Sequence, residues 1–163
     1  MGAGKTSIGK KLAKKLACPF MDTDKLIAIE EGMSISKIFE LKGEAYFRSL
    51  EKKLIEGLIT DEFKIVATGG GLPCHNDLMS TLNILGTCVY LKVKPETLFL
   101  RLKEGKFKRP LIANFEDEAL RIFIEEKLLE REKTYLKAAI VLVEAEQKIE
   151  NVILHLHQCQ KSS

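Results

Sequence analysis

The sequence predicts an α/β protein in which helices cover both faces of a parallel sheet. Four short apolar segments alternate with stretches whose apolar residues recur every three or four positions. This alternation is typical of parallel sheets, because each crossover between parallel strands needs a helix. A length of 163 residues suits a single compact domain. We therefore expect one three-layer α/β/α domain over residues 1–163.

The N-terminal half is expected to contain four helices and two strands. Apolar residues at helical spacing directly behind the first glycines predict the first helix, through Ile8, Leu12 and Leu16. Gly32 separates two short helices, and a long amphipathic helix follows, with an apolar face of Phe47, Leu50, Leu54 and Leu58. The segments "CPFMDTD" and "KIVAT" predict short strands. The expected ranges, in order, are helix 5–17, strand 18–24, helices 24–31, 34–41 and 43–59, and strand 64–68.

The C-terminal half continues the same alternation. The segments "TCVYLKV" and "AIVLV" predict two further strands. Pro95 suits the first turn of a helix, because its missing N–H has no intrahelical partner there anyway. Residues 106–117 lack periodicity and are expected to form a loop. The remaining ranges are helix 76–82, strand 87–93, helix 95–105, helix 116–137, strand 139–143 and helix 149–158.

Composition excludes several classes of protein. The net charge of +3 is small and its basic residues are spread along the chain, which argues against nucleic-acid binding. No apolar run approaches the roughly 20 residues of a membrane span, and no signal peptide precedes the Lys-rich start. The four cysteines are far apart, which favours free thiols in a reducing compartment. We expect a cytoplasmic monomer, since nothing in the sequence marks an interface.

The stretch "GAGKT" at 2–6 is the second half of a phosphate-binding loop. Glycines let successive backbone N–H groups turn toward phosphate oxygens, and the following helix adds partial positive charge. Lys5 would reach the β- and γ-phosphates of a nucleotide, and the Thr6 hydroxyl would bind Mg²⁺. The alternative is an ordinary helix start, where small residues beside lysine are common. The expected nucleotide-binding residues are Gly2, Ala3, Gly4, Lys5, Thr6 and Ser7.

Polar or glycine-rich segments follow two of the predicted strands, where α/β proteins place ligand groups. Asp22 and Asp24 could divide their roles between Mg²⁺ and a substrate hydroxyl, or one of them could cap the next helix. The triplet Gly69–Gly71 requires either close backbone approach or positive φ, because three glycines cost conformational entropy. A plain turn is the alternative for the triplet, but a turn rarely needs three glycines.

Arginine is used sparingly in a lysine-rich chain. Of 26 basic residues only five are arginines, namely Arg48, Arg101, Arg109, Arg121 and Arg131. The planar guanidinium binds carboxylate and phosphate in a bidentate manner that lysine cannot reproduce. Selected arginines are therefore candidates for anion binding, although Arg121 is expected to be a solvated surface residue. Cys74 and His75 lack a second base nearby in the sequence, so we do not expect a Cys/His nucleophile.

In this order, "GAGKT", "DTD", "GEAYFRSLE", "TGGG", "KRPL" and R-x-x-x-Y resemble the motifs of the shikimate kinase family of P-loop kinases. The match runs from Met1 to at least Tyr135. The resemblance implies ATP-dependent phosphorylation of the shikimate 3-hydroxyl, giving shikimate 3-phosphate and ADP in aromatic amino-acid biosynthesis. It also implies the family strand order 2-3-1-4-5, a shikimate-binding region at about 24–61 and a lid at about 105–117.

On the nucleotide side, the resemblance implies a role for each matching residue. Lys5 would be the catalytic phosphate lysine and Thr6 the Mg²⁺ ligand, with Asp22 holding Mg²⁺ through water. Arg109 would arrive on the lid, contact the nucleotide and neutralise the phosphoryl group in transfer. A lid would also exclude water, which could otherwise accept the phosphoryl group.

On the acceptor side, the resemblance implies that Asp24 binds the shikimate hydroxyls and orients or deprotonates the attacking one. Arg48 and Arg131 would clamp the shikimate carboxylate, and Gly69, Gly70 and Gly71 would supply backbone contacts to the ring substituents. A related kinase with another acceptor, such as gluconate, is the alternative activity. The two arginines and the triple glycine argue against it.

The sequence departs from the family pattern in two places. Lys133 stands where the family usually has proline, which should alter the local helix more than the charge chemistry. The first P-loop glycine and the first strand are absent before Gly2. In the family that strand lies between the strands expected at 64–68 and 87–93. We therefore expect Met1 not to be the natural first residue, with a non-catalytic, truncated binding protein as the alternative.

Overall fold

The computed structural model describes residues 1–58, 62–106 and 112–160. Every predicted strand is present, and most predicted helices begin and end close to their expected bounds. The helices are α1 (Lys5–Lys15), α2 (Thr23–Glu30), α3 (Ile35–Glu56), α4 (Leu78–Leu85), α5 (Pro95–Glu104), α6 (Asp117–Tyr135) and α7 (Ile149–Gln160). Two short 3₁₀ helices are η1 (Leu72–Cys74) and η4 (Glu144–Glu146). The strands are β1 (Phe20–Asp22), β2 (Ile65–Ala67), β3 (Val89–Lys92) and β4 (Ile140–Val143).

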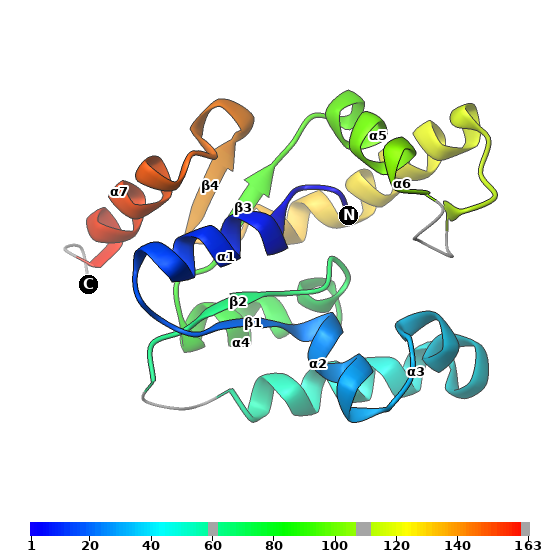
Figure 1. The fold of residues 1–163 in the computed structure, drawn as a ribbon, viewed down its shortest axis with the longest axis horizontal. Helices are drawn as coiled ribbons and strands as arrows, with labels where there is room; N and C mark the ends of the chain where they lie inside the picture. The colour runs from blue at the N-terminus through cyan, green and yellow to red at the C-terminus, as the bar shows by residue number, and fades with distance from the viewer. Residues whose placement is uncertain (59–61, 107–111, 161–163) are drawn as a thin grey trace.

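The strands form two parallel pairs within the described residues. β1 pairs with β2 in the register Phe20 to Ile65, and β3 pairs with β4 in the register Val89 to Ile140. Figure 1 shows α1 between the two pairs, with α2 and α3 beyond one pair and α7 beyond the other. Leu12 of α1 packs in one apolar cluster with residues of β2, β3, β4 and α7. The predicted parallel α/β architecture is confirmed, and the order of one continuous sheet stays a prediction.

Helix boundaries follow local chemistry. Ser34 caps α3 by accepting a hydrogen bond from the Lys37 N–H at 3.3 Å, and Pro95 occupies the first turn of α5 as expected. The two helices predicted over 34–41 and 43–59 both lie within α3 and are separated by a kink at Gly43, whose backbone is not helical (φ 80, ψ 170). That φ lies in the left-handed region that favours glycine, so the helical backbone is interrupted there, as predicted. α6 continues unbroken through Lys133, which has the N–H that the usual proline lacks.

Two apolar clusters fix the helices that carry the site. One joins α2 and α3 through Ile27, Ile38 and Phe47, and the other joins α5 and α6 through residues that include Leu102 and Leu120. α3 and α6 thereby face each other across the segment that follows β2 (Figure 1). Cys18, Cys74 and Cys88 are free thiols, as the sequence indicates. No helix in the described part of the chain is both long and apolar enough to cross a membrane.

Candidate active site

The predicted phosphate loop precedes α1 in a glycine-dependent conformation. Gly2 (φ 71) and Gly4 (φ 92) both adopt the left-handed region, and Gly4 takes the N-cap position without a side chain to cover the helix end. The first turn of α1 contains no acidic residue. Since the first N–H groups of any helix lack intrahelical acceptors, those of α1 and the positive end of its dipole are available to an anion. Ala3 packs against the cluster of α5 and α6, whereas Ser7 is exposed.

The two aspartates of "DTD" lie close enough to Lys5 for their charges to act on its pKa. Burial lowers the pKa of Lys5, and the charges of Asp24 and Asp22 oppose that shift. Burial, and then the charge of Asp22, raise the pKa of the Asp24 carboxyl, against the cations Lys5 and Arg48. Asp24 is thus a carboxylate whose proton affinity is increased and which is surrounded by both signs of charge. Such a group is a stronger base than an ordinary aspartate.

The Thr6 hydroxyl donates a hydrogen bond to Asp22 Oδ2 at 2.8 Å, which joins α1 to the end of β1. Asp22 Oδ1 also accepts from the Lys25 N–H at 3.3 Å and caps α2. The prediction that one of the two aspartates caps the next helix is therefore confirmed for Asp22. The same side chain also contacts Thr6. Within the described ranges, no group of three His, Cys, Asp or Glu side chains could hold a metal. The hydroxyl and carboxylate oxygens fit Mg²⁺, which keeps several waters and needs few protein ligands.

The glycine segment is close-packed against charged side chains. The Gly69 N–H donates to the buried Thr23 hydroxyl at 3.0 Å. A Cβ at Gly69 would lie 2.6 Å from Asp24 Oδ1 and 3.2 Å from Glu51 Oε1, and one at Gly71 would lie 2.8 Å from Arg48 Nη1. Positive φ is not the reason for these glycines, because none of Gly69–Gly71 adopts it. Close approach, one of the two predicted reasons, is the one observed.

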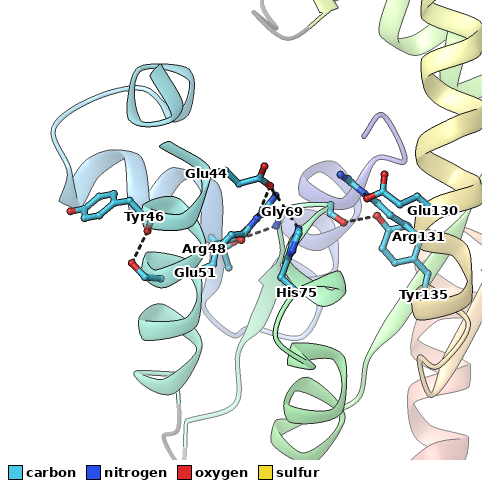
Figure 2. A network of polar contacts seen from close by, with 12 residues as sticks. Glu44, Tyr46, Arg48, Glu51, Gly69, His75, Glu130, Arg131 and Tyr135 are labelled. Carbon is cyan, nitrogen blue, oxygen red and sulfur yellow. Dashed lines mark hydrogen bonds and ion pairs between the residues drawn. The ribbon is translucent and has the colours of Figure 1, made fainter. Parts of the chain in front are cut away.

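Arg48 approaches the glycine segment from α3 and is held by two glutamates (Figure 2). Its Nη1 donates to Glu51 Oε2 at 2.6 Å, while its Nε and Nη2 both donate to Glu44 Oε1, at 3.1 and 2.7 Å. The Glu51 side chain is 1% exposed and that of Glu44 is 58% exposed. Burial raises the pKa of the Glu51 carboxyl despite its bond to Arg48. The same Glu44 oxygen lies 4.0 Å from His75 Nε2.

Arg131 and Tyr135 approach the segment from the opposite side, on α6 (Figure 2). The Tyr135 hydroxyl donates to the Gly70 carbonyl at 2.5 Å. Of the buried side-chain polar atoms in the described residues, two have no hydrogen-bond partner, Arg131 Nε and Glu51 Oε1. The nearest carboxylate to Arg131 Nε is Glu130, with Oε1 at 3.6 Å. A hydrogen-bond donor (Arg131 Nε) is therefore unused on the α6 side of the glycine segment, and an acceptor (Glu51 Oε1) is unused on the α3 side.

The other arginines lie elsewhere. Arg109 lies in 107–111, the part of the predicted loop before α6 that is outside the described residues. Arg101 on α5 directs Nη1 at the carbonyls of Gly2 (3.4 Å) and Ala3 (3.5 Å). Arg121 is exposed, as expected, and its guanidinium carbon stacks 3.8 Å from the Phe99 ring centroid.

Sequence reasoning gave no role to four residues around the site, although Thr23 and Tyr135 stand within the motifs "DTD" and R-x-x-x-Y. Glu44 and Glu51 lie four residues before and three after Arg48 on one helix, and that spacing was the available indication. Thr23 and Tyr135 bond the glycine segment from 46 and 65 residues away, and no local pattern reveals such contacts.

Comparisons with known proteins agree on one family. A family model of shikimate kinases matches residues 1–160. The shikimate kinase of Parabacteroides distasonis is 40% identical over 155 residues, covering 95% of this chain and 89% of that protein. The crystal structure of shikimate kinase from Bacteroides thetaiotaomicron has a TM-score of 0.81 at 33% identity, covering 99% of this chain and 92% of its own. Shikimate kinase from Acinetobacter baumannii, solved in complex with shikimate, has a TM-score of 0.83 at 31% identity, with coverages of 100% and 91%.

Proposed function

Because the chain belongs to the shikimate kinase family, we propose that the residues around Gly69–Gly71 and the start of α1 carry out that reaction. The activity of the chain is ATP-dependent phosphorylation of shikimate, a step of aromatic amino-acid biosynthesis. One observation carries the assignment of residues. Asp24 lies against Gly69, and the charges of Lys5 in the phosphate-binding loop and of Arg48 on α3 both act on its carboxyl.

On the nucleotide side, the open N-terminus of α1 receives the phosphates through backbone N–H groups from Gly2 to Ser7. The charges of Asp22 and Asp24 favour the charged form of Lys5, which would draw the transferred phosphoryl group toward them. Thr6 and Asp22, already joined by a hydrogen bond, would hold Mg²⁺ with the help of water. Bound Mg²⁺ neutralises charge on the β- and γ-phosphates. Since little covalent work falls to the protein, these residues act by position and charge.

On the acceptor side, Asp24 takes the proton of the attacking 3-hydroxyl as that oxygen bonds to the γ-phosphorus, while the bond between the γ-phosphorus and the β,γ-bridging oxygen breaks and ADP leaves. Its raised pKa supports this role, because a carboxylate with greater proton affinity is a stronger base. Arg48 and Arg131 bind the shikimate carboxylate from the two sides of the glycine segment, and Gly69–Gly71 contact the ring. The unpartnered Arg131 Nε supports the clamp, because an anion there would satisfy a buried donor.

Several finer features belong to the same proposal. Residues 1–163 form one domain, with acceptor binding at about 24–61 and a lid at about 105–117 that brings Arg109 to the nucleotide. The two parallel strand pairs correspond to strands 2-3 and 4-5 of the family order 2-3-1-4-5, which the similarity to the solved kinases supports. The protein works as a cytoplasmic monomer.

An assay of ADP release, with and without shikimate, tests the proposal. Arg131→Ala should raise the KM for shikimate about tenfold to a hundredfold, because a hydrogen bond to a charged group contributes about 1.5–3 kcal/mol. The KM for ATP should change much less. Arg121→Ala, on the same helix but stacked on Phe99, is the matched control and should behave as the wild type. An unchanged shikimate KM in Arg131→Ala would remove Arg131 from the clamp.

A further inference from the structure

Three groups surround the Arg48 guanidinium, and they differ in how firmly they are held. Glu51, which is almost fully buried, bonds Nη1. A Cβ at Gly71 would lie 2.8 and 2.9 Å from Nη1 and Nη2 but 3.2 Å from Cζ. Because both Nη atoms are nearer than Cζ, Gly71 faces the edge of the guanidinium that carries the two Nη atoms. The remaining edge, formed by Nε and Nη2, is the other edge that can receive a carboxylate in a bidentate manner.

Glu44 occupies that remaining edge with a single oxygen. Its Oε1 accepts both hydrogen bonds, and its side chain is the most solvent-exposed of the groups on Arg48. An exposed glutamate on a long helix gains little from an ion pair and can change rotamer at small cost. Among the groups around Arg48, Glu44 is thus the one that an incoming carboxylate can replace without disturbing a buried side chain.

We propose that Glu44 is an internal competitor of the substrate, occupying the Nε–Nη2 edge of Arg48 until the shikimate carboxylate takes its place. The proposal rests on the proposed role of Arg48 as a carboxylate ligand. No bond is made or broken in the exchange, since one carboxylate replaces another on the same donors. His75 Nε2 lies 4.0 Å from the same Glu44 oxygen, so the displaced side chain has a polar neighbour. Glu44 thereby sets the affinity for shikimate and does not take part in phosphoryl transfer.

The proposal predicts an effect opposite to that of a structural role. Glu44→Gln keeps the shape of the side chain but removes its charge, so shikimate should bind about two- to fivefold more tightly. A fivefold change corresponds to about 1 kcal/mol, at 1.4 kcal/mol per factor of ten. Both the KM and the dissociation constant measured by calorimetry should fall, while kcat stays unchanged. Glu44→Ala should show the same direction. If Glu44 instead only held Arg48 in place, both variants would bind shikimate more weakly.

Two further variants separate the possible outcomes. Glu56→Gln removes a similarly exposed charge about three turns further along α3, so it measures the general effect of net charge. A similar gain in affinity there would overturn the proposal. Arg48→Lys removes the bidentate fork and should raise the KM for shikimate at least tenfold. If Arg48→Lys binds shikimate normally, the clamp and the competitor role both fail. If only Arg48→Lys is impaired and both Glu44 variants match the wild type, the competitor role alone fails.

Discussion

Replacing Gly71 with alanine tests whether the third glycine exists to let Arg48 approach. The backbone tolerates the change, since Gly71 lies at φ −82 and ψ −25, a helical conformation open to any residue. Alanine should even stabilise by about 0.4–1 kcal/mol through the unfolded chain. The new Cβ, however, would lie 2.8 and 2.9 Å from the two Nη atoms. Arg48 must therefore retreat by about half an ångström to reach ordinary van der Waals contact.

That retreat disturbs the 2.6 Å bond from Arg48 Nη1 to the buried Glu51. A hydrogen bond between charged groups is worth about 1.5–3 kcal/mol, so the net loss of stability should be about 1–2 kcal/mol. The KM for shikimate should rise by about tenfold to a hundredfold in the ADP-release assay, with little change in the KM for ATP. Urea unfolding measures the loss of stability.

Gly86→Ala is the control, because Gly86 is extended (φ 175) and a Cβ there would meet nothing within 4 Å. It should leave both the activity and the unfolding free energy close to those of the wild type. A Gly71→Ala enzyme with an unchanged shikimate KM would refute the reasoning that the triplet serves close approach to Arg48.

Two further predictions concern groups that touch the same segment. Tyr135→Phe removes the hydrogen bond to the Gly70 carbonyl but keeps the ring against Tyr90. The free energy of unfolding in urea should therefore fall by about 1 kcal/mol. An unchanged free energy of unfolding would contradict the contact. Glu51→Gln should change the pH dependence of stability. Burial raises the pKa of the folded-state Glu51 carboxyl above 4.5, so its contribution is full below that pH and is lost as pH rises through the raised pKa. The unfolding free energy of the wild type should therefore fall relative to Glu51→Gln as pH increases from about 4.5, and parallel curves would contradict this.

Local periodicity was sufficient to predict most of the fold. Helices such as α1 and α5 have apolar residues on one face and a clear first turn, so their bounds follow from sequence. The break between the two helices within α3 falls at Gly43, where the sequence predicts the second of them to begin, because a glycine at φ 80 interrupts the helical backbone. The arrangement of the strands depends on contacts between distant segments, for which a single sequence gives only the family resemblance as a guide.

The candidate site was predictable where its chemistry is local. The Thr6 hydroxyl meets Asp22, and Asp24 lies beside Lys5, as the motif order indicates. The partners of the arginines were not predicted, because a glutamate one turn away on a helix usually indicates only a surface ion pair. The Glu51–Arg48 pair is different because the Glu51 side chain is buried. That burial depends on how α3 packs against the glycine segment, which local sequence does not reveal.

The two arginines of the clamp should therefore differ in what their removal costs. Arg48 makes three hydrogen bonds to two glutamates, so its removal would leave the nearly buried Glu51 without its cation. Breaking a buried pair in this way typically costs about 3–5 kcal/mol, which would affect folding as well as binding. Arg131 has a buried Nε without a hydrogen-bond partner among the described residues, and its nearest carboxylate is exposed on the surface of α6. Its charge is less compensated in the free protein, so Arg131→Ala should weaken shikimate binding with little loss of stability, which makes it the cleaner test of the clamp.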